Sequence, residues 1–339
     1  MHSIEREFRA TQPLAGEPER RLPLEAPVGL RPPRTVLHAL ATVTRAGTTP
    51  VLLAPVVVGA TLGWWESGRF SLLGLLLSLL GMAATGWGLA ALHDYYDYLL
   101  SKRPGVRGAP DALGTGYGLL WYGFVTPQTV RDTGLILLSV AGLSSVALTV
   151  IAGWPVLFFA ALSFLLLWAV IGLPLRYGYR SWGLGEIGTG LGVGLLPALI
   201  SYYVQAHTVS WLPVWAGGAF GLLSLLLFFN FNAVQIRRDW LLHKRTLTVR
   251  LGLTRALDVS ALLLVVAFVL LLCMVVLTDL PLLALIGLGG LPVGLSVFAR
   301  LPREGQSATA VVRVYRTGGQ AAVLAAALFC LALLLDRLV

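Results

Sequence analysis

The run His93-Asp94-Tyr95-Tyr96-Asp97 follows a long apolar stretch and holds the residue types best suited to chemistry. Asp94 and Asp97 are three positions apart, so at the end of a helix they share one face. Paired carboxylates are hard oxygen ligands for Mg²⁺, an ion that commonly also binds substrate phosphates. Lys102 and Arg103 follow, and such cations hold phosphate oxygens, arginine through two hydrogen bonds and lysine as a point charge. The segment therefore predicts a site for a Mg²⁺-diphosphate.

A second polar segment has the same organisation. It begins with Asn232 and Gln235 at the end of another apolar run, continues to Asp239, and passes into the basic residues Lys244 and Arg245. A single segment of this kind is equally well explained as a charged anchor at a helix end. Two of them, four apolar runs apart, favour a shared site.

The composition says what kind of element must position these residues. Hydrophobic residues make up 57% of the 339 positions and charged residues only 12%, about half the charged fraction of an average soluble domain. The mean hydropathy is +0.80. The two cysteines, Cys273 and Cys330, both lie in apolar runs, which excludes a secreted disulfide scaffold. The composition indicates a polytopic membrane protein.

A membrane-spanning helix needs about 20 mainly apolar residues. The sequence predicts an all-α protein of nine transmembrane helices around a central cavity, and it predicts an interfacial or re-entrant helix over 116–125. The nine predicted spans are 46–65, 70–92, 133–152, 154–173, 184–204, 211–232, 256–277, 280–298 and 318–335.

The basic residues predict the orientation. With nine spans, all of the 25 Lys and Arg residues except Arg69 and Arg337 fall on the side of the N-terminus. The positive-inside rule then places the N-terminus in the cytoplasm. This positive charge is spread over five segments, so it reflects topology and excludes a nucleic-acid partner. We expect residues 1–40 to be a polar, Pro-rich cytoplasmic tail and residues 41–339 to be the transmembrane domain.

The second polar segment ends in the string Lys244-Arg245-Thr246-Leu247-Thr248-Val249-Arg250-Leu251-Gly252. This string, with Asn232 and Asp239 before it, resembles the UbiA superfamily of intramembrane aromatic prenyltransferases. Asp94 and Asp97 match the first aspartate motif of that family. There are departures: His93 stands where the family has Asn, Gln235 where it has Asp, and Ser101 or Arg103 where it has a further Asp.

The resemblance implies transfer of a polyprenyl group from a polyprenyl diphosphate to an aromatic acceptor, with Mg²⁺ assisting ionisation. Within the family the chain is most similar to the 1,4-dihydroxy-2-naphthoate prenyltransferases of menaquinone synthesis, which work in the cytoplasmic membrane with the site facing the cytoplasm. By that resemblance Asp94, Asp97 and Asp239 are catalytic and hold Mg²⁺, and Glu186 lies near the acceptor. The remaining predicted substrate-binding residues are His93, Lys102, Arg103, Asn232, Gln235, Lys244 and Arg245.

Two other functions are compatible with these observations. One is prenylation of another acceptor, such as a hydroxybenzoate, homogentisate or a tetrapyrrole carboxylate. The other is a non-enzymatic protein that binds isoprenoid lipids, which the missing motif carboxylates favour. A transporter fits less well, because the acidic residues lie at the ends of spans and not at the membrane midplane.

Overall fold

The computed structural model describes residues 32–106, 111–172, 174–180, 183–301 and 307–338. Helix is the only regular secondary structure that these residues form, so the all-α prediction is confirmed. Most of the predicted tail lies outside the described residues. Eight helical segments are long and apolar enough to cross a membrane: Ala46–Ser67 (containing α3, Thr49–Ser67), α4 (Leu72–Ser101), α6 (Pro127–Ala152), α7 (Trp154–Ile171), Leu184–Ala206 (α8, Leu184–Thr189, to α9, Leu196–Ala206), α10 (Leu212–Val234), α13 (Leu253–Leu277) and α16 (Ala308–Leu338).

The ninth predicted span, 280–298, is shorter than the others. It is an apolar segment, Leu282–Phe298, that begins as the 3₁₀-helix η4 (Leu282–Gly289) and continues as α14 (Gly290–Phe298). A 3₁₀-helix rises about 2.0 Å per residue against about 1.5 Å for an α-helix. The segment therefore extends further than its residue count suggests, and the count of nine spans stays a prediction.

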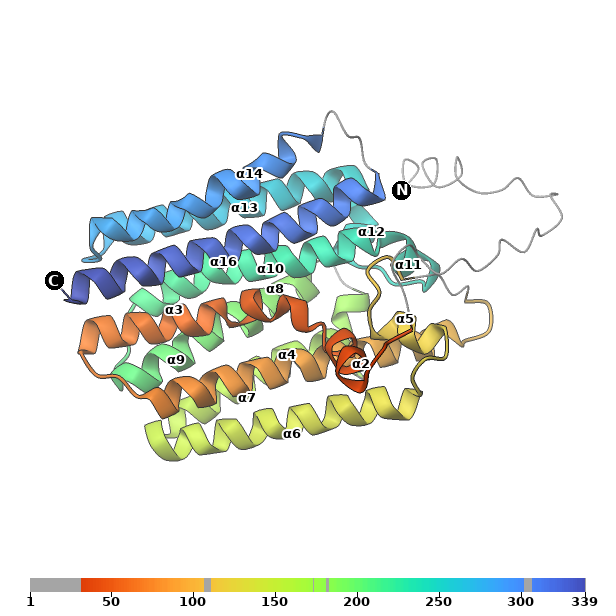
Figure 1. Cartoon of the computed structure of the whole chain (residues 1–339), viewed down its shortest axis with the longest axis horizontal. Helices are drawn as coiled ribbons and strands as arrows, with labels where there is room; N and C mark the ends of the chain where they lie inside the picture. The colour runs from red at the N-terminus through yellow and green to blue at the C-terminus, as the bar shows by residue number, and fades with distance from the viewer. Residues whose placement is uncertain (1–31, 107–110, 173, 181–182, 302–306, 339) are drawn as a thin grey trace.

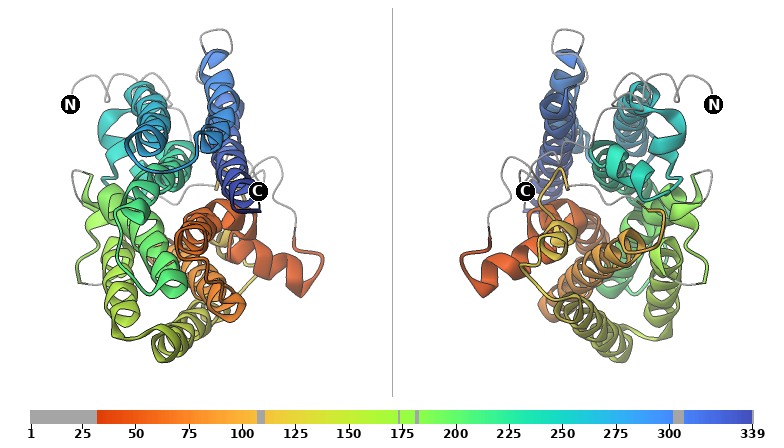
Figure 2. Two further views of the ribbon diagram at one scale, coloured as in Figure 1. Left: turned by 90° about the vertical axis from the view of Figure 1, so that its left-hand side faces the viewer. Right: turned by 90° about the vertical axis from the view of Figure 1, so that its right-hand side faces the viewer.

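Short helices gather at one end of the bundle, opposite the end that holds the C-terminus (Figure 1). Seen along its length in Figure 2, the molecule is an irregular ring of helices and not a single layer. The predicted helix over 116–125 is found at the first of these ends as the single-turn α5. The short elements are α2 (Val36–Val43), α5 (Gly116–Trp121), η2 (Tyr177–Tyr179), α11 (Ile236–Leu241) and α12 (Leu247–Leu251).

Local sequence explains where the spans begin and end. The Ser71 hydroxyl accepts a hydrogen bond from the Gly74 amide and caps α4, as an N-cap serine does. Gly68 ends α3 in the left-handed conformation, with φ 71°. Between α8 and α9 the helix widens into a π-helical turn over Gly190–Leu195. A methyl group on Gly194 would lie 2.1 Å from the Gly221 Cα of α10, so glycine is required there for the two spans to touch.

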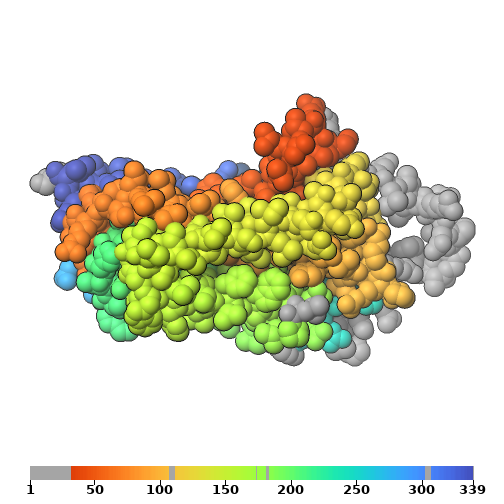
Figure 3. Space-filling model, turned by 90° about the horizontal axis from the view of Figure 1, so that it is seen from below, coloured from red at the N-terminus to blue at the C-terminus, as the bar shows by residue number. Residues whose placement is uncertain are grey.

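The outer surface of the bundle is apolar. Exposed residues include Ile136 and Val150 on α6, Leu165 on α7 and Leu262 on α13, as expected of helices that face lipid. The largest buried cluster lies where α3, α10, α13 and α16 pack together. Helix α2 projects from the body, as Figure 3 shows, with Val36 and Leu37 exposed. The buried side chains thus lie between pairs and groups of helices and do not fill the whole interior of the bundle.

Candidate active site

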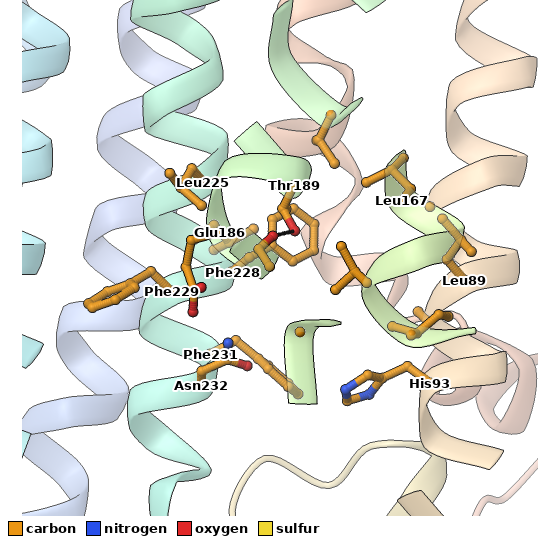
Figure 4. Close-up of a pocket in the computed structure, with 18 of the residues that line it drawn as sticks. Leu89, His93, Leu167, Glu186, Thr189, Leu225, Phe228, Phe229, Phe231 and Asn232 are labelled. Carbon is orange, nitrogen blue, oxygen red and sulfur yellow. Dashed lines mark hydrogen bonds between the residues drawn. The ribbon is translucent and has the colours of Figure 1, made fainter. Parts of the chain in front are cut away.

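A cavity opens among the helices near the end that carries the short elements (Figure 4). Most of its wall is apolar and comes from α4, α7, α8 and α10, with Leu89, Leu167 and Phe228 among the side chains. Polar groups are fewer, and Figure 4 shows His93, Glu186 and Asn232 around the same space. The polar and charged residues that line the cavity include Arg45, His93, Tyr179, Glu186, Asn232, Lys244 and Thr246.

A buried network of charged side chains lies beside the polar part of the cavity. Five of its members are at most 1% exposed, which requires that their charges be paired. We call this network the charge cluster. It consists of Arg45, Asp94, Asp97, Asp111, Arg238, Asp239 and Lys244. His93 joins the first two to the rest, because its Nδ1 lies 3.5 Å from Asp94 Oδ1 and 3.8 Å from Asp97 Oδ2.

Asp97 is at the centre of the charge cluster. Its Oδ1 accepts a hydrogen bond from the Tyr179 hydroxyl at 2.8 Å. Its Oδ2 lies 3.0 Å from the Lys244 ammonium nitrogen and 3.2 Å from Nη2 of Arg238. One carboxylate on α4 thus links η2 with the segment that follows α10. The two motifs that the sequence analysis separated therefore meet at Asp97.

Asp94 is held by a residue that the sequence analysis did not include among the site residues. Arg45, just before the first span, donates to Asp94 Oδ1. Its Nη2 also lies 3.1 Å from His93 Nδ1, and its guanidinium lies 4.1 Å from the centre of the Phe231 ring. Arg45 has a left-handed backbone, with φ 54°. For a residue other than glycine this costs about 1–3 kcal/mol and is found mainly where the surroundings or the function require it.

Asp111 brings the loop between α4 and α5 into the cluster. Its carboxylate accepts hydrogen bonds from the amides of Leu113 and Thr115, and from Nε2 of Gln235. Gln235 Oε1 in turn accepts from the Ala112 amide at 3.3 Å. Gln235 was predicted to bind substrate, but here it is 1% exposed and ties this loop to the end of α10.

Burial and the charges of the cluster together shift the pKa values of two residues outside the spans. Burial alone would lower the pKa of the Arg238 guanidinium, but the carboxylates of Asp97 and Asp239 outweigh burial and raise that pKa above its usual value. Burial, and after it the Asp97 carboxylate, raises the pKa of the Tyr179 hydroxyl well above its usual value. Arg238 therefore stays a cation, and Tyr179 stays a hydrogen-bond donor to Asp97.

The predicted site residues divide into three groups. His93, Glu186, Asn232 and Lys244 line the cavity. Asp94, Asp97, Asp239 and Gln235 are buried in or against the charge cluster, out of the cavity wall. The structure does not bring Lys102, Arg103 or Arg245 to the cavity; all three are exposed.

The three exposed cations have local reasons for their position. Lys102 and Arg103 follow the last turn of α4, and the Lys102 ammonium lies 4.8 Å from the centre of the Tyr98 ring and 5.3 Å from that of Trp121. Arg245 donates its backbone amide to the Tyr179 carbonyl, and its side chain is exposed while that of Lys244 is buried. Adjacent residues in this extended segment thus face opposite ways.

The donor set allows a test of the predicted Mg²⁺ site. In the described part of the chain, no three His, Cys, Asp or Glu side chains gather around one point as metal ligands; the carboxylates are paired with Arg and Lys. Even so, Asp94 Oδ2 and Asp239 Oδ2 are buried without a hydrogen-bond partner among the described residues. Free carboxylate oxygens in this position fit a hard cation such as Mg²⁺.

The chain matches known proteins over most of its length. The model of the UbiA prenyltransferase family matches residues 52–317. Two similar sequences are 1,4-dihydroxy-2-naphthoate octaprenyltransferases, from Mycobacterium leprae, 29% identical over 215 residues, and from Escherichia coli, 31% identical over 220 residues. Each match covers 61% of this chain and 67% of the relative.

The fold is also that of solved structures. A UbiA homologue from Archaeoglobus fulgidus bound to GPP and Mg²⁺ has a TM-score of 0.59 at 13% identity, over 86% of this chain and 99% of the other. The apo structure of a UbiA homologue from Aeropyrum pernix has a TM-score of 0.57 at 16% identity, over 85% and 97%. At such low identity these similarities show the fold alone. With the family model matching 52–317, the chain belongs to the UbiA family of prenyltransferases.

Proposed function

We propose that the protein transfers a polyprenyl group from a polyprenyl diphosphate to 1,4-dihydroxy-2-naphthoate. The observation that carries this proposal is the cavity, in which a long apolar wall leads to a polar region containing Arg45, His93 and Lys244. A polyprenyl diphosphate has this same division into an apolar chain and an anionic head. The relatives named as 1,4-dihydroxy-2-naphthoate octaprenyltransferases support the acceptor.

The polar region is suited to holding the diphosphate. Lys244 is 3% exposed, and it and Arg45 would contact the diphosphate oxygens in a setting of low dielectric, where such contacts are strongest. Asp97 keeps the Lys244 ammonium in place at 3.0 Å. We propose that the free oxygens of Asp94 and Asp239 hold Mg²⁺, which when bound would neutralise charge on the departing diphosphate, while Asp97 positions the cations around them.

The rest of the cavity is suited to the carbocation and the acceptor. Ionisation leaves an allylic cation that water would destroy, and the apolar side chains of Leu89, Leu167 and Phe228 keep water away from it. We propose that Glu186, on the first turn of α8, contacts a hydroxyl group of the aromatic acceptor and orients its ring towards the allylic carbon. As the new carbon–carbon bond forms, the attacked ring carbon loses its own substituent, a proton or carbon dioxide, which restores the aromatic ring.

The charge distribution supports a location in the cytoplasmic membrane. The chain is an integral membrane protein with several apolar spans. The excess of Lys and Arg on the side of the N-terminus supports a cytoplasmic N-terminus. The short helices and the cavity's polar region would then face the cytoplasm, where a water-soluble acceptor is available.

A transfer assay tests the proposal. Detergent-purified protein is given radiolabelled geranylgeranyl diphosphate, Mg²⁺ or EDTA, and either 1,4-dihydroxy-2-naphthoate, 4-hydroxybenzoate or homogentisate. We expect a radiolabelled product formed from 1,4-dihydroxy-2-naphthoate only when Mg²⁺ is present. Product from another acceptor alone would show that the acceptor is not 1,4-dihydroxy-2-naphthoate. Tight diphosphate binding without any product would show that the protein binds isoprenoids and is not a transferase.

A further inference from the structure

Arg238 occupies an unusual position for a positively charged side chain. It comes from α11 and is 1% exposed. Its Nη2 lies 3.2 Å from Asp97 Oδ2 and 3.7 Å from Asp239 Oδ1, and its Nη1 lies 3.7 Å from Asp111 Oδ1. The guanidinium is thus surrounded by carboxylates from α4, from α11 and from the loop before α5.

A convergence of carboxylates from separate segments is the usual setting of a divalent cation. Here the guanidinium fills the space between them, and the centre of the Tyr117 ring lies 4.9 Å from the guanidinium carbon. The neighbouring Gln235 brings no charge to this position and donates to Asp111. Arg238 therefore neutralises these carboxylates through a group that is covalently attached to the chain and cannot dissociate.

The oxygens left over are too few for several ions. Asp97 Oδ1 accepts from Tyr179, and its Oδ2 faces Lys244 and Arg238. Among the described residues, the carboxylate oxygens of the cluster without a hydrogen-bond partner are Asp94 Oδ2 and both oxygens of Asp239, of which Oδ1 lies 3.1 Å from the Lys244 ammonium. Mg²⁺ takes about six oxygen ligands, commonly one or two from carboxylates and the rest from phosphate and water.

We propose that Arg238 is a built-in cation that takes the place of a divalent ion between Asp97, Asp111 and Asp239, so that the protein binds at most one Mg²⁺ together with a polyprenyl diphosphate. The inference rests on the proposed diphosphate substrate. It assigns Arg238 a positioning role: the guanidinium joins the two motifs and does not touch the cavity.

Counting bound ions tests this directly. Mn²⁺ serves as the spectroscopic probe for Mg²⁺, and the full-length protein in detergent is titrated with Mn²⁺ by electron paramagnetic resonance. Each titration contains a saturating, unreactive geranylgeranyl thiolodiphosphate, whose binding is measured separately by equilibrium dialysis. We expect no more than one Mn²⁺ per chain in the wild type and one further Mn²⁺ in Arg238→Gln.

Two matched variants show whether a change in the Mn²⁺ count comes from loss of the Arg238 charge or from general disruption of the structure. Arg237→Gln removes the exposed neighbouring arginine and should leave the wild-type count. Arg238→Lys retains a positive charge at the same place and should also leave it. Two or more Mn²⁺ in the wild type would overturn the inference without reference to any variant, and so would an unchanged count in folded Arg238→Gln. Failure of the thiolodiphosphate to bind would instead refute the proposed function.

Discussion

Charged side chains gather at both ends of the bundle, but they are buried at one end and exposed at the other. At the end with the short helices, Asp94 and Asp97 are wholly inaccessible and Arg238 is 1% exposed. At the other end Glu66, Asp279, Asp336 and Arg337 are all exposed, although they too line a hollow.

The difference in burial implies a difference in free energy, because buried charges are costly to the folded protein and exposed charges are not. Removing charges from water costs several kcal/mol per ion, which pairing offsets only when the geometry is good, whereas exposed ion pairs contribute about 0–1 kcal/mol and cost little. The exposed end can therefore be explained as surface charge at the edge of an apolar slab. The buried end has no such explanation, and the proposed diphosphate site accounts for its retention.

The largest expected contrast is between Asp97→Asn and Asp336→Asn. Asp97→Asn removes the nearer of the two carboxylates that Lys244 and Arg238 share and leaves them only Asp239 in common, which should lower the free energy of unfolding by about 3–5 kcal/mol and reduce kcat by ~10²–10³-fold. Asp336→Asn should change the free energy of unfolding by less than about 0.5 kcal/mol. Unfolding in SDS and the transfer assay measure both; equal effects of the two variants would contradict the comparison.

A second contrast uses two adjacent cations. Lys244 lines the cavity and is buried, and Arg245 is exposed. Lys244→Gln should reduce kcat/KM for the diphosphate by about 100-fold, because it removes a charge in a low-dielectric site, while Arg245→Gln should change it by about twofold. The comparison fails if Arg245→Gln has the larger effect.

A smaller effect is expected for the carboxylate at the cavity wall. Glu186→Gln replaces a charged hydrogen-bonding group by a neutral one, worth about 1.5–3 kcal/mol, and should raise KM for the aromatic acceptor about tenfold with KM for the diphosphate unchanged. Glu66→Gln, at the exposed end, is the control. A change in the KM for the diphosphate alone would show that Glu186 contacts the diphosphate and not the aromatic acceptor.

The smallest effect belongs to the exposed end. The Trp65 indole donates to the Asp336 carboxylate at 2.8 Å. Trp65→Phe removes this hydrogen bond and should lower the free energy of unfolding by about 1 kcal/mol or less, with transfer activity at the wild-type level. Loss of activity in this variant would show that the two ends are not independent.

The sequence predicts the long apolar spans well, since the length of an apolar run determines whether it can cross a membrane. It also predicts that Asp94, Asp97 and Asp239 belong together, because their motifs repeat at equivalent positions. It could not show that Arg45 and Asp111 complete the cluster, since they join it only through tertiary contacts.

The sequence also could not show which of two neighbouring cations is buried in the site. Arg237 and Arg238 are chemically identical in the sequence, and Lys244 and Arg245 are adjacent cations of the same motif. Which member is buried depends on the direction of one turn of helix or one extended segment. The Arg238 side chain is inside and that of Arg237 outside, because α11 begins immediately after α10 and presents one face to Asp97.

The most direct test of the account measures Mg²⁺-dependent transfer of a radiolabelled geranylgeranyl group to 1,4-dihydroxy-2-naphthoate by the wild type, Asp97→Asn and Asp336→Asn. The account predicts product at the wild-type rate from Asp336→Asn, and a rate lower by about 10²–10³-fold from Asp97→Asn that remains folded. Full activity in Asp97→Asn, or its loss in Asp336→Asn alone, would contradict the assignment of the chemistry to the buried end.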